Sequence, residues 1–259
     1  MKPSFENKVA FIAGASGGIN LAIAEAYGRA GARVVILSRN PERIEAAAEG
    51  LRALGVDATA YAGDVRDHQR LEAIYAEVAE THGPIDVLVS GAAGNFLAPA
   101  AKLSANGFKT VVDIDLLGTF NVFHAAFAHL RKPGAALIAI TAGQAVNPMP
   151  FQVHACAAKA GVNMVVKCLA LEWGPAGVRV NAISPGPIKD TEGMARLTAD
   201  PASEAALKAR LALRDYGTRQ DIAQAALYLA SEAAAYVTGT ILNVDGGNDL
   251  GDASADALN

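Results

Sequence analysis

The stretch from Val9 to Asn20 constrains the fold of this chain most, because it joins an apolar run to a glycine-rich turn. The run predicts a buried strand that Gly14 ends, and Gly18 lets backbone approach a ligand closely. Leu21 to Tyr27 then begins a helix, whose free N–H groups and dipole favour a pyrophosphate. The spacing differs from Gly-x-Gly-x-x-Gly and from a P-loop, yet the chemistry is that of a dinucleotide-binding turn.

Length and charge exclude several classes of function. The chain has 259 residues, 52% of them hydrophobic, so one domain spanning residues 1–259 with a large core is expected. A formal net charge of −4 without a Lys/Arg block gives no footprint for nucleic acid or an anionic membrane. Residues 1–8 lack a signal-peptide core, and no apolar run approaches the roughly 20 residues of a membrane helix. We therefore expect small-molecule chemistry in the cytoplasm, with no nucleic-acid or membrane partner.

Cysteine and histidine usage indicates no metal site. Cys156 and Cys168 fall in one predicted helix, and no Cys/His spacing would assemble a tetrahedral zinc site. The five histidines are scattered. We assign no metal and expect both thiols to be buried and reduced.

Strand-like runs alternate with helical stretches along most of the chain. The runs are continuously apolar, as strands covered on both faces require, and right-handed crossovers then fix the winding. This pattern predicts an α/β fold, a doubly wound (Rossmann-like) parallel sheet of about seven strands with helices on both faces. Beyond the first strand, the expected strands are 34–37, 57–61, 85–90, 136–140, 179–183 and 241–244. The expected later elements are long helices at 104–130 and 151–173, a helical substrate lid at about 190–215, a helix at 220–231 and a polar tail at about 249–259.

The second strand ends in Ser38-Arg39-Asn40, where a nucleotide fold holds the adenosine ribose. An acidic residue there would accept the ribose hydroxyls of NAD, whereas Arg39 offers a planar, permanently charged fork suited to a 2′-phosphate. NADP(H) is therefore favoured over NAD(H). The alternative is that Arg39 is a solvated charge before the helix that Pro41 begins.

Two charged residues lie on apolar helix faces. Residues three and four away from Asp115 are small or apolar, and a carboxylate among them is costly unless it has a partner. Lys159 likewise has mostly small or apolar helical neighbours, whereas a solvated lysine normally lies among other charges. Both residues are candidates for a pocket. The alternative for Asp115 is a solvated helix charge.

These motifs together resemble the short-chain dehydrogenase/reductase family over nearly the whole chain. The family's usual first motif is Thr-Gly-x-x-x-Gly-Ile-Gly, and here Asn20 replaces the third glycine. Asp64-Val65 resembles the family's Asp-Val pair, and Ser90 to Phe96 looks like its Asn-Asn-Ala-Gly turn. The resemblance implies that the cofactor is bound by Gly14, Ser16, Gly17, Gly18, Ile19, Ser38, Arg39, Asp64, Val65, Ala92, Ala93, Gly94, Lys159, Pro185, Gly186, Ile188 and Thr191.

The departures from the family pattern bear on the reaction. Ordinary members carry Ser, Tyr-x-x-x-Lys and a helix Asn, and the matching positions here are Ala142, Ala155, Lys159 and Asp115. Hydride delivery to a ketone builds an alkoxide that needs the tyrosine's proton. Two interpretations remain. One is reduction of an activated carbon–carbon double bond, which leaves a delocalised enolate that hydrogen bonds stabilise and water protonates. The other is a non-catalytic NADP-binding homologue.

Several segments resemble the peroxisomal-type 2,4-dienoyl-CoA reductases of this family. They are 92–97, 113–115 with 118–122, 152–155, 172–175, and 185–188 with 191–193. The resemblance implies NADPH-dependent conversion of a 2,4-dienoyl-CoA to a 3-enoyl-CoA in unsaturated fatty acid degradation, with Asp115 and Lys159 at the catalytic positions. Another enoyl thioester is the alternative substrate. The resemblance also implies acyl-CoA contacts at Arg66, Phe96, Ser104, Asn106 and Arg196.

The quaternary structure and the location follow from the same helices and the same resemblance. The two long helices have more apolar character than one sheet face should cover, which predicts a homotetramer. The family resemblance implies the same assembly and adds residues 236–247 as a second interface. The peroxisomal relatives end in a targeting tripeptide, whereas this chain ends Ala257-Leu258-Asn259. A cytoplasmic location is therefore expected.

Overall fold

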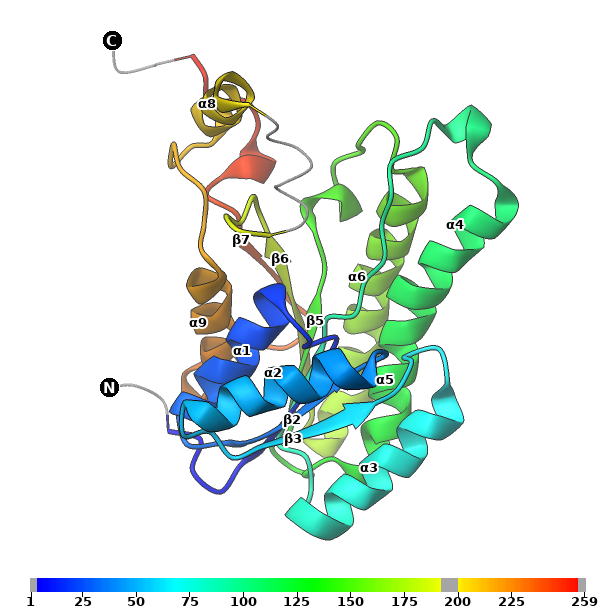
Figure 1. The fold of residues 1–259 in the computed structure, drawn as a ribbon, viewed down its shortest axis with the longest axis vertical. Helices are drawn as coiled ribbons and strands as arrows, with labels where there is room; N and C mark the ends of the chain where they lie inside the picture. Colours follow the sequence, from blue (N-terminus) through cyan, green and yellow to red (C-terminus); the bar gives the residue numbers. More distant parts are fainter. Residues whose placement is uncertain (1–3, 192–199, 256–259) are drawn as a thin grey trace.

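The computed structural model describes residues 4–191 and 200–255 and contains one parallel sheet (Figure 1). The strand order is β3-β2-β1-β4-β5-β6-β7, so the direction of winding reverses between β1 and β4. This confirms the predicted sheet of about seven parallel strands. The strands are β1 (Val9–Ala13), β2 (Arg33–Ser38), β3 (Ala58–Ala62), β4 (Val87–Ser90), β5 (Ala136–Ile140), β6 (Arg179–Pro185) and β7 (Ile241–Val244).

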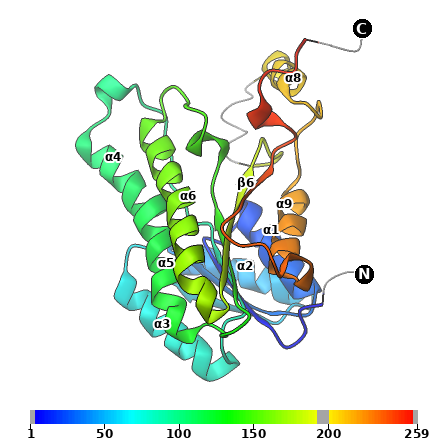
Figure 2. The same cartoon turned by 180° about the vertical axis from the view of Figure 1, so that it is seen from behind.

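Helices cover both faces of the sheet. On one face lie α1 (Gly18–Arg29), α2 (Pro41–Ala53) and α9 (Arg219–Ala230), and on the other lie α3 (His68–His82), α4 (Ala105–Val112), α5 (Gly118–Ala126) and α6 (Val153–Trp173) (Figures 1 and 2). The short helix α8 (Pro201–Arg210) lies beyond the carboxyl ends of the strands, beside the end of the chain.

Each strand contributes to two cores because its side chains alternate between the faces. In β1, Val9, Phe11 and Ala13 pack with α3, α5 and α6, whereas Ala10 and Ile12 pack with α1, α2 and α9. All five are at most 2% exposed. Burial on both faces explains why the strands read as continuous apolar runs.

Side-chain caps fix where several helices begin. The carboxamide of Asn40 accepts a hydrogen bond from the Arg43 N–H, and Pro41 supplies the first residue of α2. Thr218 and Asp221 form a reciprocal capping box at the start of α9. These caps hold α2 and α9 at defined positions beside the cavity described below.

The predicted helix 104–130 is not one regular helix. It consists of α4, a π-helical turn (Asp113–Leu117), α5 and a 3-10 turn (Phe127–His129). Such π turns insert one residue into the helical register and are frequent at functional sites. Within the turn, the Asp115 carbonyl accepts a 2.7 Å hydrogen bond from the Thr119 hydroxyl, which competes with regular helix bonding.

The later predictions also need correction in detail. Cys168 is exposed and Cys156 is only partly buried, so the prediction of two buried thiols is wrong. The two residues are 12 positions apart, about 120° around a helix of 3.6 residues per turn, and therefore lie on different faces of α6. Of the predicted lid at 190–215, α8 is present, and residues 192–199 lie outside the described part of the chain.

Two segments have the length and composition of membrane-spanning helices, namely Ala105–His129 and Val153–Ala176. The prediction that no stretch approaches that length is therefore wrong. About half of each apolar window is buried inside the protein, 56% and 44% respectively. The apolar character of these helices thus serves the core in part, and the remainder faces outward.

Candidate active site

A cavity of about 1090 Å³ opens at the carboxyl ends of the strands, across the point between β1 and β4 where the winding reverses. Open α/β sheets bind ligands at this position. The volume lies just above the range of roughly 300–1,000 Å³ typical of small-molecule pockets, which suits an extended ligand. Every residue predicted to bind the cofactor lines this cavity, including Thr191 at the edge of the described chain.

The turn between β1 and α1 is shaped by its glycines. Gly14 has φ +82°, and a Cβ there would lie 2.6 Å from the backbone nitrogen of Ala92. Gly17, by contrast, has no atom within 4 Å of a Cβ position and provides no side-chain cap for α1. The first N–H groups of α1 therefore face open space at the positive end of the helix, where a phosphate binds well.

Basic side chains lie at the end of β2. Arg39, which is exposed, and Arg43 in the first turn of α2 both line the cavity. Sequence reasoning identified Arg39 and missed Arg43, although the spacing of four residues was a readable signal. Two guanidinium groups on one wall suit an anionic group such as a phosphate.

Asp64, at the end of β3, pairs with Arg66, with an Nη2–Oδ2 distance of 2.6 Å. The hydrogen bond from Arg66 lowers the pKa of the Asp64 carboxyl, and the charge of Arg39 adds a smaller effect in the same direction. Asp64 is therefore an anion at neutral pH and lines the cavity beside Arg39.

Asn20 occupies the position of the missing third glycine without disturbing the turn. Its side-chain N–H₂ donates to the carbonyls of Gly14 at 3.1 Å and Gly91 at 2.8 Å. A Cβ on Gly91 would lie 2.1 Å from the Asn20 Oδ1. The amide of Asn20 thus fills the space that a side chain at position 91 would need.

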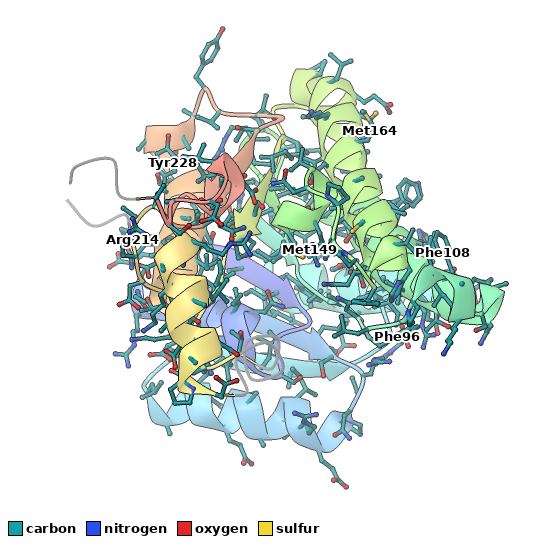
Figure 3. All side chains as sticks on the ribbon, turned by 90° about the horizontal axis from the view of Figure 1, so that it is seen from above. Phe96, Phe108, Met149, Met164, Arg214 and Tyr228 are labelled. Atoms are coloured by element: carbon teal, nitrogen blue, oxygen red, sulfur yellow. The ribbon has the colours of Figure 1, made fainter. Side chains whose placement is uncertain are left out.

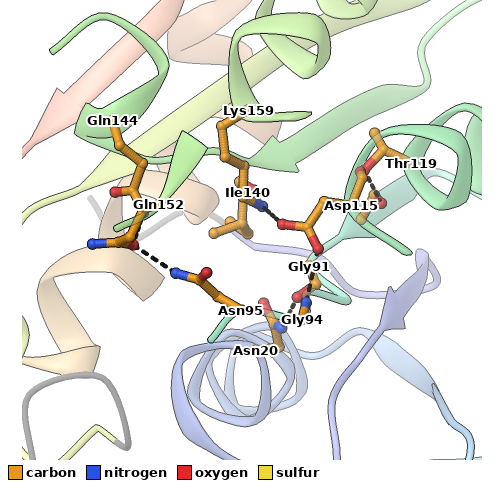
Figure 4. A network of polar contacts seen from close by, with 11 residues as sticks. Asn20, Gly91, Gly94, Asn95, Asp115, Thr119, Ile140, Gln144, Gln152 and Lys159 are labelled. Carbon is orange, nitrogen blue, oxygen red and sulfur yellow. Dashed lines mark hydrogen bonds and ion pairs between the residues drawn. The ribbon is translucent and has the colours of Figure 1, made fainter. Parts of the chain in front are cut away.

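Lys159 and Asp115 form a buried ion pair, with an Nζ–Oδ2 distance of 3.2 Å (Figure 4). Lys159 also donates to the Ile140 carbonyl at 3.0 Å, and the Gly94 N–H donates to Asp115 Oδ1 at 2.7 Å. Lys159 is 7% exposed and lines the cavity, whereas Asp115 is 1% exposed and is not part of the described lining. The carboxylate therefore acts through Lys159 and Gly94.

The side of the cavity on which the family resemblance places the acyl-CoA, called the acyl side below, is formed by loops. Phe96 lines it, 41% exposed, with its ring 4.5 Å from that of His154. Met149 also lines this part, and Phe96 and Met149 are both labelled in Figure 3. Gln152 Oε1 accepts from the side-chain amides of Asn95 at 2.6 Å and Gln144 at 3.2 Å. This side thus combines large apolar side chains with a few amides.

Three of the five residues predicted to contact the acyl-CoA do not line the cavity. Ser104 caps α4 by accepting from the Gly107 N–H, and the carbonyl of Asn106 accepts from the hydroxyl of Thr110 within that helix. Arg66 faces a second, open hollow formed by Asp64, Arg66, Asp67, His68 and Gln69. Arg196 lies outside the described residues. Of the four described residues of this set, the structure brings only Phe96 to the cavity.

The two positions that carry Ser and Tyr in ordinary members of the family are alanines in this chain. Ala142 lines it, and Ala155 is buried beside it on α6 at 2% exposed. Among the described lining residues there is no tyrosine. Within residues 4–191 and 200–255, no group of three or more His, Cys, Asp or Glu side chains is arranged to hold a metal ion. Lys159 and the hydroxyl of Thr141 are buried hydrogen-bond donors that line the cavity at the end of β5.

Comparisons with known proteins agree with this geometry. The family model described as enoyl-(acyl carrier protein) reductase matches residues 14–249. The chain is 43% identical to the (3E)-enoyl-CoA-producing peroxisomal 2,4-dienoyl-CoA reductase of Saccharomyces cerevisiae, over 94% of this chain and 84% of that protein. It is 35% identical to a probable (2E)-enoyl-CoA-producing 2,4-dienoyl-CoA reductase of Bacillus subtilis, over 95% and 98%. A short-chain alcohol dehydrogenase structure from Sinorhizobium meliloti superposes with a TM-score of 0.90 at 30% identity, covering 96% and 98%.

Proposed function

This chain belongs to the short-chain dehydrogenase/reductase family and is an oxidoreductase of that type, and we propose that it reduces 2,4-dienoyl-CoA thioesters to 3-enoyl-CoA with NADPH. One observation carries the proposal. The buried Lys159–Asp115 pair lies at a cavity whose described lining contains no tyrosine. Reduction of a conjugated double bond does not need the proton that a tyrosine gives to an alkoxide.

The cavity suits NADPH. Gly17 and Gly18, where a Cβ would meet no atom within 4 Å, leave the start of α1 open for the diphosphate, and Arg39 with Arg43 gives two cations for a 2′-phosphate. When bound, the cofactor supplies the hydride. Its predicted contacts in the later part of the chain are Pro185, Gly186, Ile188 and Thr191, which line the cavity beside Lys159.

Lys159 is the catalytic donor in this proposal. An ammonium has three N–H donors, and the Ile140 carbonyl and Asp115 take two of them, which leaves one for a ligand. That donor holds the bound ribose or the thioester oxygen on which negative charge collects. Asp115 positions Lys159 and the Gly94 backbone. The carboxylate is 1% exposed, which favours this positioning role.

Proton delivery to the α-carbon then falls to water in the cavity. Hydride addition at the δ-carbon places the electron pair along the conjugated system and onto the thioester oxygen. Protonation of the α-carbon leaves the double bond between the β- and γ-carbons, which is the 3-enoyl product. Protonation at the γ-carbon would leave the 2-enoyl product instead.

The decisive experiment mixes the protein with NADPH and a panel of enoyl- and dienoyl-CoA thioesters and follows cofactor oxidation. We expect turnover of the dienoyl thioesters and a 3-enoyl product by NMR. Turnover of enoyl thioesters alone would favour the alternative substrate, and NADPH binding without turnover would favour a non-catalytic homologue. Reduction of a ketone by this protein would contradict the argument that the reaction needs no tyrosine because the reduced bond is a carbon–carbon double bond.

The proposal includes a cytoplasmic homotetramer. Large apolar side chains of α6 are exposed, with Leu171 82% and Met164 58% exposed, and Tyr236 is fully exposed. Apolar surface of this kind is typical of an interface between copies. Light scattering at micromolar concentration tests it, and a monomer would contradict it.

A further inference from the structure

Asn20 breaks the glycine pattern of the first turn, and the proposed reaction does not explain it. We propose that Asn20 is a positioning residue that ties the β1–α1 turn to the Lys159–Asp115 pair, so that it influences both NADPH affinity and turnover. The proposal rests on the proposed cofactor site, and it concerns a side chain that the family's usual motif lacks.

Three segments meet at the amide of Asn20. Its N–H₂ group donates to the carbonyl of Gly14 at the start of the turn and to the carbonyl of Gly91 after β4. The Gly91 N–H in turn donates to the Ala13 carbonyl at 3.1 Å. Asn20 is 9% exposed and lines the cavity, so these bonds form in a largely dehydrated place. Hydrogen bonds are stronger in such surroundings.

The contacts continue from Gly91 to the catalytic lysine (Figure 4). Gly94 follows Gly91 by three residues, and its N–H donates to Asp115 at 2.7 Å. Asp115 pairs with Lys159 at 3.2 Å. The turn after β4 is therefore held at one end by Asn20 and at the other by the carboxylate that positions Lys159. A shift of Gly91 would therefore also move the Gly94 N–H, which donates the hydrogen bond to Asp115.

The side chain of Asn20, on α1, fills the space that a side chain at position 91, in the turn after β4, would occupy. The three atoms nearest to a Cβ on Gly91 all belong to the Asn20 amide, at 2.1 to 2.4 Å. This arrangement carries a cost, because Asn20 Oδ1 is buried without a hydrogen-bond partner among the described residues. A glycine at position 20 would remove that cost, which indicates that the two bonds of the amide have a use beyond stability.

The test compares Asn20→Ala with Asn181→Ala. Asn181 is a matched control because its buried amide also bonds the backbone, donating to the Val237 carbonyl at 2.9 Å and accepting from the Thr240 N–H at 3.1 Å, away from the cavity lining. We expect Asn20→Ala to raise the NADPH Kd about 10-fold by calorimetry and to lower kcat at saturating NADPH about 10-fold, the effect of roughly 1.4 kcal/mol. Asn181→Ala should lower only the unfolding midpoint.

Two double variants distinguish a positioning role of Asn20 from a general loss of stability. Gly91→Ala should raise the NADPH Kd in the wild-type background and add nothing after Asn20→Ala, because the atoms it would meet are then absent. In an Asp115→Ala background, Asn20→Ala should still raise the Kd but lower kcat no further. Additive effects in both cycles would overturn the proposal, as would equal changes in Kd and kcat for the Asn20 and Asn181 variants.

Failure of this proposal is distinguishable from failure of the proposed function. If the wild type binds NADPH but reduces no dienoyl-CoA, the reaction is wrong, and the calorimetric cycle with Gly91→Ala still decides the role of Asn20 in cofactor binding. If the wild type turns over and Asn20→Ala changes neither Kd nor kcat, only the role of Asn20 is wrong. A wild type that binds no NADPH overturns both.

Discussion

The cofactor side and the acyl side of the cavity differ in how they are built. The cofactor side is made of short turns at the ends of β1 to β4 and of β6, together with Lys159 on α6, and every residue predicted for it lines the cavity. The acyl side is made of the loop around Phe96, the segment around Met149 and the region toward α8, and only Phe96 of its four predicted residues that the structure describes lies there. Sites on strand ends are thus better specified by local sequence than sites on long loops.

The reason lies in the topology of the sheet. The carboxyl ends of neighbouring parallel strands must meet at one edge, so a residue directly after a buried strand has a defined position. A residue 10 or more positions into a loop has no such constraint. Ser104 and Asn106 follow β4 at that distance and are used by α4 instead.

The largest effect should occur at Lys159, which both sides share. Lys159→Ala leaves Asp115 as an unpaired buried charge, so we expect a loss of about 3–5 kcal/mol of unfolding free energy together with weaker NADPH binding. Asp115→Ala removes the group that positions the Lys159 donor and should lower turnover by roughly 10²- to 10³-fold, as for the loss of one donor to a developing oxyanion, with NADPH binding little changed. Urea unfolding and steady-state kinetics measure both.

The double variant Lys159→Ala/Asp115→Ala is the control for this prediction. It removes the uncompensated charge and should be more stable than Lys159→Ala alone. If Asp115→Ala kept full dienoyl-CoA turnover, the carboxylate would be a structural helix residue.

The next largest effect tests how closely the turn between β1 and α1, on the cofactor side, is packed. Gly14→Ala places a Cβ 2.6 Å from the Ala92 nitrogen at φ +82°, so we expect a loss of about 2–4 kcal/mol in urea unfolding. Gly17→Ala meets no atom within 4 Å and should leave unfolding unchanged. The added methyl group would occupy the space in which we propose that the diphosphate binds. Gly17→Ala should therefore raise the NADPH Kd about 10-fold (about 1.4 kcal/mol). Equal unfolding for the two variants would break the argument.

A smaller effect concerns the choice of cofactor. Arg39→Ala or Arg43→Ala should each lower NADPH affinity roughly 10-fold and leave NADH affinity unchanged, because only NADPH carries the 2′-phosphate. Arg33→Ala is the control, since Arg33 lies at the opposite end of β2 in an exposed pair with Asp57. Calorimetry with both cofactors checks this, and an unchanged preference in all three variants would speak against the 2′-phosphate site.

Substitutions on the acyl side should change the KM for the thioester substrate. Phe96→Ala removes a large apolar side chain from the lining and should raise that KM about 5- to 10-fold, as expected for losing part of one buried aromatic contact, with the NADPH Kd unchanged. Arg66→Ala should change it less than about 3-fold, because Arg66 is bound to Asp64 outside the cavity. If Arg66→Ala raised the thioester KM more than this, the CoA would lie along the second hollow, which Arg66 helps to form. That outcome would support the predicted contact between Arg66 and the acyl-CoA.

The smallest effect is the pH dependence of the Asp64–Arg66 pair. The pKa of Asp64 is lowered in the folded protein by the Arg66 hydrogen bond, so the pair stabilises the fold at neutral pH and down to the ordinary pKa of an aspartate. That contribution is lost as the pH falls through the lowered value. Because both side chains are partly exposed, we expect less than about 1 kcal/mol. Asp64→Asn should flatten this part of the stability profile in urea unfolding between pH 7 and pH 3, and an unchanged profile would contradict it.

The sequence by itself determined the strands, their parallel pairing and the cofactor side of the cavity. Continuous apolar runs predict strands buried on both faces, and the sheet confirms them to within a few residues. The placement of Asp115 and Lys159 on apolar helix faces also predicted two charges that need partners. These features are readable because each depends on a local pattern of a few residues.

Only the tertiary structure decided which groups meet. The ion pair joins residues 44 positions apart, since 159 minus 115 is 44, and the bond from Asn20 to Gly91 spans 71. The π turn at Asp113–Leu117 depends on how α4 and α5 pack against α6. Contacts between distant segments follow from the register of packed helices and strands, and a difference of one residue in that register redirects a side chain. A local sequence pattern does not contain that register, because it is fixed only when the layers pack together.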